Sequence, residues 1–362
     1  MDKNLQKIID LENGRRDNML RRKNPCLQVL FWECTLRCNL NCVHCGSDCK
    51  HDSLKADMPL TDFTRVLDEV ALVMKPENII VVTTGGEVLL RKDIIECGRE
   101  ITKRGFFWRM VTNGMLLTPQ MLRDLMNAGL GGIAVSLDGL EDDHNWMRGN
   151  PKSFERVVGA INALAQTSED SLFWDVITCV NKHNINDLPR IKDFVISLGV
   201  KHWRVVTVFP SGRAKEHHDL QLDREQLRMV FDFIVSTRKE GRIHLSYGCE
   251  GFLGTYENEI RDYQYFCQAG VNVASILHDG SISGCLSIRS KYDQGNIYHD
   301  SFIDVWTNRF QDYRDVSWKK KGACQNCEAW RWCEGNGMHL RDNDGNLILC
   351  NYQKLFHYNK NL

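Results

Sequence analysis

The chain has 362 residues, 43% of them hydrophobic, and its 46 basic and 47 acidic residues almost cancel. This length and composition suffice for one large domain and one smaller domain. The balanced charge provides no basic surface for nucleic acid and no polybasic membrane tag, and no apolar run resembles a signal peptide or a membrane span. We therefore expect a soluble, cytoplasmic protein that binds neither nucleic acid nor membrane.

Strand-like apolar runs alternate with helix-like patterns through the first two thirds of the chain. The strand-like runs cover residues 27–32, 79–83, 107–112, 132–137, 172–180 and 202–208. Helical patterns cover residues 60–74, 154–164, 191–198 and 227–237, and helix starts are expected at Thr118 and Asp223. Six strands alternating with about six helices predict an α/β fold, a partial (β/α)6 TIM-like barrel, whose functional groups lie at the C-terminal ends of the strands.

The texture of the sequence changes after Gly248, where glycines and aromatic residues become dense and helical periodicity thins. We predict three parts: an N-terminal extension (residues 1–25), the barrel (26–247) and a small cysteine-rich domain (248–362). The extension is too short for a folded peptide-recognition domain. The hydrophobic core of the last part is too small to be stable without further cross-links, which its cysteines could provide.

Fifteen cysteines are present, and they cluster instead of spreading evenly. Five lie between Cys34 and Cys49, and four late ones are Cys324, Cys327, Cys333 and Cys350. In a long chain without an export signal, such clusters favour metal or redox chemistry over disulfides.

Three cysteines after the first strand, Cys38, Cys42 and Cys45, have the spacing C-x3-C-x2-C. Three thiolates on one loop leave a coordination position of a metal centre open, which is typical of catalytic sites. This loop resembles the signature of the radical S-adenosylmethionine (SAM) superfamily, in which the three cysteines hold a [4Fe–4S] cluster. The alternative is a zinc loop that also uses Cys34; under the resemblance, Cys34 and Cys49 are packing thiols.

The second strand ends in Gly85, Gly86 and Glu87, which is similar to the Gly-Gly-Glu motif of the same superfamily, although Val88 replaces the usual proline. The resemblance implies that SAM occupies the open iron. The glycines would let it approach the backbone, and Glu87 would accept a hydrogen bond from its ammonium group. An ordinary turn is the alternative.

Polar residues also end the third and fourth strands, at Asn113 and at Ser136 and Asp138. Ser136 and Asp138 alternate along the chain and so face the same side, where they could bind the ribose hydroxyls of SAM. Asn113 is a further candidate for cofactor binding. The alternative for Ser136 and Asp138 is that they are ordinary turn residues at a strand end. Arg148 would contact the cofactor or a substrate carboxylate, and the alternative is a solvated surface arginine.

The C-terminal cysteines continue the resemblance. Cys267 and Cys285 are separated as C-x12-G-x4-C, and Cys324, Cys327, Cys333 and Cys350 follow. Together they resemble the SPASM domain, which implies at least one auxiliary [4Fe–4S] cluster, held by the last four cysteines. A structural zinc site with the same four ligands is the alternative.

A second auxiliary cluster is an open question at this point, because the family spacing places its last ligand at Gly337. Cys267 and Cys285 would belong to this cluster. Cys249 would be its third ligand, a catalytic hydrogen-atom donor, or a buried free cysteine.

The resemblance implies an enzyme that cleaves SAM reductively to a 5′-deoxyadenosyl radical and abstracts hydrogen from a substrate carbon, with a flavodoxin or ferredoxin as electron donor. The expected substrate is a peptide or protein, which would be crosslinked, epimerised or oxidised under anaerobic conditions. A sulfatase maturase is disfavoured, because Leu286 follows Cys285 where that subclass carries an aspartate. The alternatives are a tetrapyrrole side chain as substrate, or a non-enzymatic zinc or iron–sulfur scaffold.

Overall fold

One sheet organises the molecule, and its strands follow each other in space nearly as in the sequence. The computed structural model describes residues 3–53, 55–168, 171–248 and 250–356. The strand order is β10-β9-β8-β1-β2-β3-β4-β5-β6-β7. The strands are β1 (Val29–Thr35), β2 (Ile80–Gly85), β3 (Phe107–Thr112), β4 (Leu130–Ser136), β5 (Phe173–Val180), β6 (His202–Thr207), β7 (His244–Tyr247), β8 (Val273–Ile276), β9 (Ser281–Ser283) and β10 (Gly295–Asn296).

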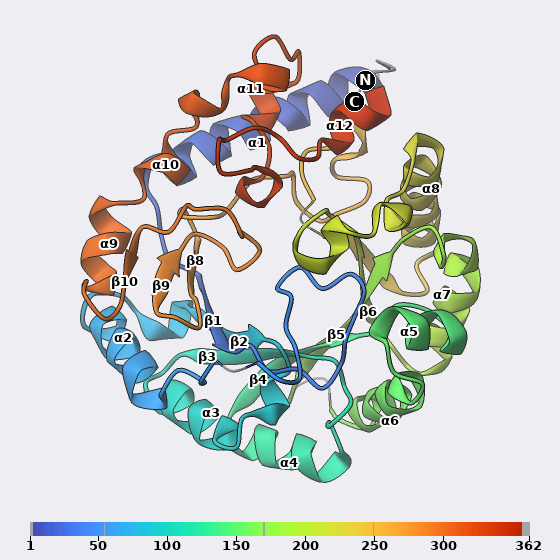
Figure 1. The fold of residues 1–362 in the computed structure, drawn as a ribbon. Coiled ribbons are helices and arrows are strands. Elements are labelled where there is room, and N and C mark those ends of the chain that lie inside the picture. The colour runs from blue at the N-terminus through green and yellow to red at the C-terminus, as the bar shows by residue number, and fades with distance from the viewer. Residues whose placement is uncertain (1–2, 54, 169–170, 249, 357–362) are drawn as a thin grey trace.

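Strands β1 to β7 are all parallel, and helices cover their outer face in a ring (Figure 1). The α/β partial barrel predicted from the sequence is therefore confirmed. The helices are α1 (Lys3–Lys23), α2 (Leu60–Val73), α3 (Ile94–Lys103), α4 (Pro119–Asn127), α5 (Glu141–Arg148), α6 (Ser153–Ala165), α7 (Leu188–Ser197), α8 (Arg224–Glu240), α9 (Phe302–Asn308), α10 (Gln311–Arg314), α11 (Trp330–Cys333) and α12 (Asn351–Phe356).

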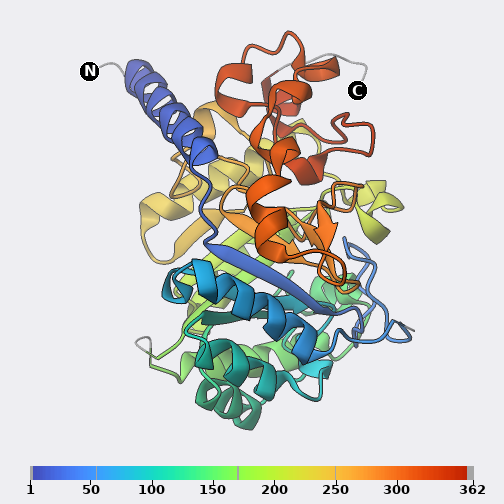
Figure 2. The same ribbon diagram turned by 90° about the vertical axis from the view of Figure 1, so that its left-hand side faces the viewer.

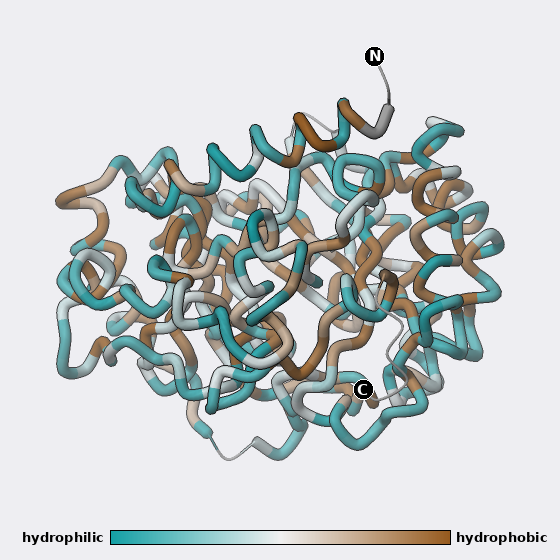
Figure 3. Tube along the Cα trace, turned by 90° about the horizontal axis from the view of Figure 1, so that it is seen from above, coloured by the Kyte–Doolittle hydropathy of each residue, from teal (hydrophilic) through white to brown (hydrophobic). Residues whose placement is uncertain are grey.

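Local sequence explains most of these elements. Helix α2 turns Phe63, Val66, Leu67 and Val70 inward, and the ring of Phe63 stacks on Trp32 of β1 with centroids 4.1 Å apart. Both expected helix starts are confirmed: the Thr118 side chain caps α4, and Asp223 and Gln226 form a capping box at α8. Hydrophilic residues follow the outside of the molecule and hydrophobic ones its interior (Figure 3).

The C-terminal part is continuous with the barrel. Strand β8 pairs in parallel with β1, from Val29↔Val273 to Trp32↔Ile276, and β9 and β10 extend the same sheet antiparallel. One hydrophobic core joins both parts. The boundary at residues 247 and 248 stays a prediction, and no break in the sheet marks it among the described residues.

Helix α1 lies against the C-terminal part, above the barrel in Figure 2. Glu12 accepts a hydrogen bond of 2.8 Å from Trp332 Nε1 and pairs with Arg331 at 2.7 Å. The N-terminal extension is therefore a helix anchored by polar contacts, which its charged sequence did not indicate. Across the described residues, no helix combines the length and the apolar character that crossing a bilayer demands.

Candidate active site: a cysteine loop over the barrel cavity

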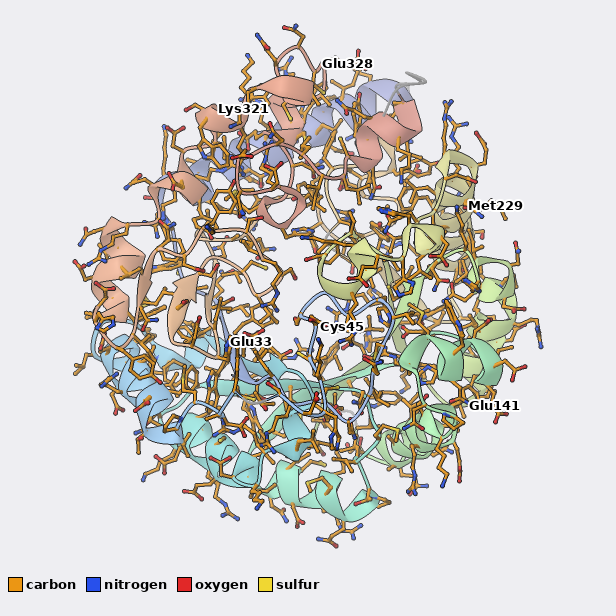
Figure 4. The ribbon with its side chains drawn as sticks, in the orientation of Figure 1. Glu33, Cys45, Glu141, Met229, Lys321 and Glu328 are labelled. Carbon is orange, nitrogen blue, oxygen red and sulfur yellow. The ribbon has the colours of Figure 1, made fainter. Side chains whose placement is uncertain are left out.

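The cysteine loop (residues 36–50) leaves the C-terminal end of β1 and crosses the middle of the ring (Figure 1). The C-terminal end of α5 holds it, because Asn41 N donates to Arg148 O at 3.3 Å and Val43 N donates to Met147 O at 3.0 Å. Figure 4 shows Cys45 near the centre, with Glu141 and Met229 at the rim. This position over the strand ends is the one predicted from the sequence.

Arg213, in the segment after β6, fixes the loop from the opposite side. Its Nε donates to Cys42 O at 2.8 Å, and its Nη1 donates to Cys49 O and to the Asp48 carboxylate, both at 2.9 Å. The preceding Gly212 has a φ of +55°, and a Cβ there would lie 2.3 Å from Cys45 O. Glycine is therefore required where the two segments touch.

The three thiols predicted as cluster ligands lie together. Cys38 and Cys42 are each 8% exposed and share an apolar cluster with Leu40, Cys49 and the partly buried Cys45. Donors approach the sulfurs: Asn113 Nδ2 lies 3.9 Å from Cys38 Sγ, and Arg148 Nη1 lies 3.7 Å from Cys42 Sγ. These donors and the dry surroundings fit a set of anionic thiolates on an iron–sulfur cluster.

The thiols differ in acidity. Burial raises the pKa of Cys38 to about 11 and also raises that of Cys42, although the charge of Arg148 opposes the shift. A hydrogen bond from Cys49 lowers the pKa of Cys45 to about 5, so Cys49 supports a ligand as well as packing. Cys34 is fully buried in the main core, as expected for a packing thiol.

Among the described residues, no three His, Cys, Asp or Glu side chains converge as ligands of a single ion would. A [4Fe–4S] cluster does not require such convergence, because each thiolate binds a different iron.

The Gly-Gly-Glu turn holds the start of the cysteine loop. Gly86 N donates to Thr35 O at 2.8 Å, and Glu87 N donates to Arg37 O at 2.9 Å. A Cβ on Gly85 would lie 2.2 Å from Thr35 O, and one on Gly86 would lie 2.1 Å from Arg37 O. The two glycines are therefore needed for backbone packing, whatever they contribute to a ligand.

Glu87 itself is fully buried, and its carboxylate is occupied by protein donors. Oε1 accepts hydrogen bonds from Thr112 Oγ1 at 2.7 Å and from Leu89 N at 3.1 Å, and Oε2 accepts one from Asn113 N at 2.8 Å. Burial raises its pKa, against the effect of these hydrogen bonds. The side chain thus ties the ends of β2 and β3 together, and a hydrogen bond to SAM stays a prediction.

Asp138 and Arg148, predicted separately, form one buried unit. Arg148 Nε lies 2.6 Å from Asp138 Oδ2, and Asp138 Oδ1 accepts a hydrogen bond of 2.9 Å from Cys179 N. Burial opposes ionisation of Asp138, but Arg148, His44, His144 and the hydrogen bond from Cys179 N together outweigh it, and the pKa is lowered. Arg148 therefore links Asp138 to Cys42 and is not a solvated arginine.

A cavity of about 540 Å³ lies inside the barrel, between the cysteine loop and the C-terminal part. Ser136, Asp138 and Arg148 line its barrel side, and Cys267 and Cys285 line the opposite side. Ser136 and Asp138 thus face the same space, as their alternation indicates. The structure therefore brings three of the predicted cofactor residues and two of the C-terminal thiols to one chamber, whereas Gly85, Gly86, Glu87 and Asn113 are not among its lining residues.

Two ionisable residues that sequence reasoning missed also line this cavity. Arg204 of β6 is 41% exposed in its side chain and pairs with Asp175 at 2.5 Å. Glu250 is 6% exposed, accepts hydrogen bonds from Thr207, and has a pKa raised to about 7 by burial. A cationic group and a carboxyl near neutrality give the chamber the means to bind and to exchange protons with a substrate.

The four late cysteines line one small enclosed cavity, as expected for a shared cluster. These residues are Cys324, Cys327, Cys333 and Cys350. Arg341, 1% exposed, donates from Nη2 to Cys324 Sγ at 3.5 Å and thereby brings a positive charge to the thiols. Burial raises the pKa of Cys350 to about 11 and raises that of Cys327. The donor set fits an auxiliary iron–sulfur cluster.

The second auxiliary set is smaller. The thiols of Cys267 and Cys285 influence each other, and Met338 N donates to Cys267 Sγ at 3.5 Å. Gly337 occupies the position where the family spacing has a ligand, and Cys249 lies outside the described residues. The role predicted for Cys249 therefore stays a prediction.

A buried carboxylate joins the barrel, the cysteine loop and the C-terminal part. Glu33 of β1 is fully buried; it accepts from Arg289 Nη2 at 2.8 Å and lies 3.1 Å from His278 Nδ1. The same guanidinium donates to Ser47 Oγ in the cysteine loop. Burial opposes ionisation of Glu33, but His278 and Arg289 outweigh it and the pKa is lowered. We call Glu33, His278, Arg289 and Ser47 the Glu33 clasp.

The residues missed by sequence reasoning had weak signals. Gly212 and Arg213 follow a strand end, which is where barrel sites form, so their position was the available clue. Helix α5 begins with three acidic residues and ends at Gly149 with a φ of +66°, both of which are ordinary helix boundaries. His44, 3.6 Å from Asp138 Oδ2, had no signal beyond its place between two cysteines.

Comparison with known proteins matches two families to this chain. Residues 32–195 match the radical SAM superfamily, and residues 267–328 match an iron–sulfur cluster-binding domain, SPASM. The first range includes the cysteine loop, the Gly-Gly-Glu turn, Ser136, Asp138 and Arg148.

Named relatives fall into two functional groups. The chain is 28% identical over 333 residues to an AdoMet-dependent heme synthase of Methanosarcina barkeri, covering 85% of this chain and 90% of that protein. It is also 28% identical over 323 residues to a mycofactocin maturase of Mycolicibacterium smegmatis, covering 85% of this chain and 77% of that protein. The fold is similar to that of native anSMEcpe with bound AdoMet and the Cp18Cys peptide, with a TM-score of 0.67 and 19% sequence identity. The match covers 91% of this chain and 94% of that chain.

Proposed function

The chain belongs to the radical SAM superfamily and carries a C-terminal SPASM domain, and we propose that it abstracts hydrogen from a carbon of a substrate held in the central cavity. Its cofactors are a [4Fe–4S] cluster, SAM and at least one auxiliary iron–sulfur cluster. The observation that carries the proposal is that one chamber is lined from both sides. Its lining includes His44 of the cysteine loop, Ser136, Asp138, Cys267 and Cys285.

The residues have distinct proposed roles. Cys38, Cys42 and Cys45 would hold the [4Fe–4S] cluster, which when bound supplies the electron that cleaves SAM reductively to a 5′-deoxyadenosyl radical. The Gly-Gly-Glu turn positions the loop, and the Ser136 hydroxyl would bind the ribose of SAM. Asp138 would act through Arg148, which neutralises it beside Cys42. The walls exclude water from the reacting carbon. A flavodoxin or ferredoxin is the proposed electron donor.

A direct assay tests this function. The protein is purified without oxygen and incubated with dithionite and SAM, and 5′-deoxyadenosine is quantified. Cys42→Ala is expected to abolish the product, whereas Cys26→Ala, at an exposed thiol, is expected to retain it. Product formation that Cys42→Ala leaves unchanged contradicts the proposal. Iron and acid-labile sulfide, measured against zinc, separate the enzyme from a zinc scaffold.

We propose a peptide or protein as the substrate, modified by crosslinking, epimerisation or oxidation. Two similarities support this class: the mycofactocin maturase relative and the shared fold of anSMEcpe, whose structure contains a peptide. Candidate peptides, taken from reading frames beside the gene, are incubated with the complete system. The reaction is run in D2O as well as in H2O, because epimerisation changes the peptide mass only through the hydrogen taken up from solvent. A SAM-dependent change in peptide mass in either solvent supports the class, and its absence in both for every such peptide contradicts it.

A tetrapyrrole side chain is the second candidate. It is favoured by the heme synthase relative, which the chain covers to 90%, and by Arg204, a cation in a cavity of about 540 Å³. Arg204 would pair with a carboxylate of the substrate. Titration with an iron porphyrin that bears carboxylate side chains would then give a spectral shift that Arg204→Gln weakens. No shift with the wild-type protein would remove this candidate.

A further inference from the structure

One wall of the central cavity carries two thiols and an imidazole. Cys267, Cys285 and His339 all line it, together with Met338. The backbone joins them closely, because Met338 N donates to Cys267 Sγ at 3.5 Å and His339 is the next residue. Cys267 and Cys285 alone are too few to hold an iron–sulfur cluster, which commonly takes four ligands.

His339 fills the space that a side chain at residue 337 would need. A Cβ built on Gly337 would lie 2.8 Å from His339 Cε1, 2.9 Å from its Nδ1 and 2.8 Å from Tyr265 Oη. A side chain at 337 would therefore collide with this imidazole and with the Tyr265 hydroxyl unless both moved. The imidazole thus lies directly beside the position where the family spacing has a ligand.

The imidazole is held in place without using its nitrogens. Its ring packs edge-on against Phe209, with centroids 5.3 Å apart. Among the hydrogen bonds and ion pairs found within the described part of the chain, none involves a ring nitrogen of His339, which is partly buried. His339 lines the same cavity as the two thiols, and a neutral imidazole is the form in which histidine binds metals.

We propose that His339 is the third protein ligand of the auxiliary iron–sulfur cluster that Cys267 and Cys285 anchor, which leaves one further coordination position of that cluster unassigned. The imidazole takes over the position that Gly337 leaves without a side chain. Because a neutral imidazole replaces an anionic thiolate, the cluster carries less negative charge and is easier to reduce than an all-thiolate one, as in His-ligated Rieske centres. The site faces the substrate chamber, so this cluster is the one placed to accept or return an electron there.

The test detects a histidine nitrogen on the cluster by pulsed electron paramagnetic resonance. The dithionite-reduced protein is prepared with natural and with ¹⁵N-labelled histidine. A histidine nitrogen coupling is expected in the wild type and in the matched control His299→Ala, an exposed histidine of the same domain. The coupling is expected to disappear in His339→Ala and in His339→Cys. A wild type without the coupling, or a coupling that survives in His339→Ala, overturns the proposal.

Two further variants separate ligation from packing. His339→Cys is expected to keep the cluster and to shift its reduction potential to more negative values. The double variant Gly337→Cys with His339→Ala moves the ligand back to position 337 and is expected to restore the iron content lost in His339→Ala. Restored iron without a coupled histidine supports ligation, and a potential unmoved in His339→Cys counts against it. None of these readouts needs SAM or substrate, so they stand apart from the proposed reaction.

Discussion

Glu250 is a carboxyl group on the cavity wall whose ionisation opposes folding. Burial raises its pKa from 4.5 to about 7. Between these values the folded protein keeps the proton and the unfolded chain loses it, so the free energy of unfolding falls as pH rises, by about 1.4 kcal/mol per unit. We expect Glu250→Gln to remove this dependence and to be more stable than the wild type at pH 8 by roughly 3 kcal/mol at most.

Anaerobic thermal unfolding between pH 5.5 and pH 8 measures this effect. The difference between Glu250→Gln and the wild type should widen up to about pH 7 and then level off. Glu225→Gln, at an exposed glutamate of α8, is the matched control and should stay within about 0.5 kcal/mol of the wild type at every pH. A constant difference between Glu250→Gln and the wild type would show that Glu250 does not titrate in this range.

The proximity of residues that lie close together in the sequence could be predicted, whereas contacts that arise only from the fold could not. Cys38, Cys42 and Cys45 lie within one loop, so the sequence already brings them together. The contact of Glu87 with SAM stays a prediction, whereas its hydrogen bonds from Thr112 and Asn113 could not be predicted, because these partners come from the end of another strand. Arg148 was ambiguous for the same reason, since Asp138 and Cys42 surround it only after folding.

At the scale of elements, the Gly-Gly-Glu turn provides a test of how the cysteine loop is held. A Cβ on Gly86 would lie 2.1 Å from Arg37 O, a backbone atom that moves only with the loop. We expect Gly86→Ala to displace the loop start, to break the hydrogen bond from Glu87 N, and to destabilise the protein by about 1–3 kcal/mol. Iron bound per chain and the affinity for SAM should both fall.

The matched control is Gly159→Ala in α6, where no atom lies within 4 Å of an added Cβ. Alanine suits an exposed helix interior better than glycine, so this variant should gain about 0.5–1 kcal/mol and keep its iron. Iron content, SAM binding and thermal unfolding are measured on both variants. Equal iron in the two would mean that the glycines serve only as a turn.

Strong periodicity explains which elements could be predicted. The six main strands and helices such as α2 and α8 carry a clear apolar pattern, and the sequence located them within a few residues. Strand β7 has only four residues, too few for a pattern to emerge. Nearly half of the residues of helix α1 are charged, and its contacts with Trp332 and Arg331 come from the far end of the chain.

At the scale of the whole molecule, one sheet joins the barrel to the C-terminal part, and the sequence divided them because composition changes at Gly248. Composition describes only residues that are neighbours in the sequence. The pairing of β8 with β1 instead joins residues more than 200 positions apart, such as Val29 and Val273. The Glu33 clasp spans the same junction. The C-terminal part therefore acts on the cysteine loop directly, through Arg289 and Ser47.

The Glu33 clasp joins the barrel, the C-terminal part and the cysteine loop. We therefore expect that breaking it loosens the C-terminal part and the cysteine loop at the same time. Glu33→Gln keeps the shape but removes the charge that pairs with Arg289, whose side chain is 26% exposed. Breaking a fully buried ion pair costs about 3–5 kcal/mol, and the partial exposure of Arg289 reduces the expected loss to about 2 kcal/mol.

Hydrogen exchange should rise both in the segment around His278 and in the cysteine loop around Ser47. The control, Asp62→Ala, removes an exposed contact of the same two parts, the 3.0 Å hydrogen bond from Tyr298 Oη, and should change neither segment. Faster exchange in only one of the two segments would show that the clasp stabilises that segment without joining it to the other.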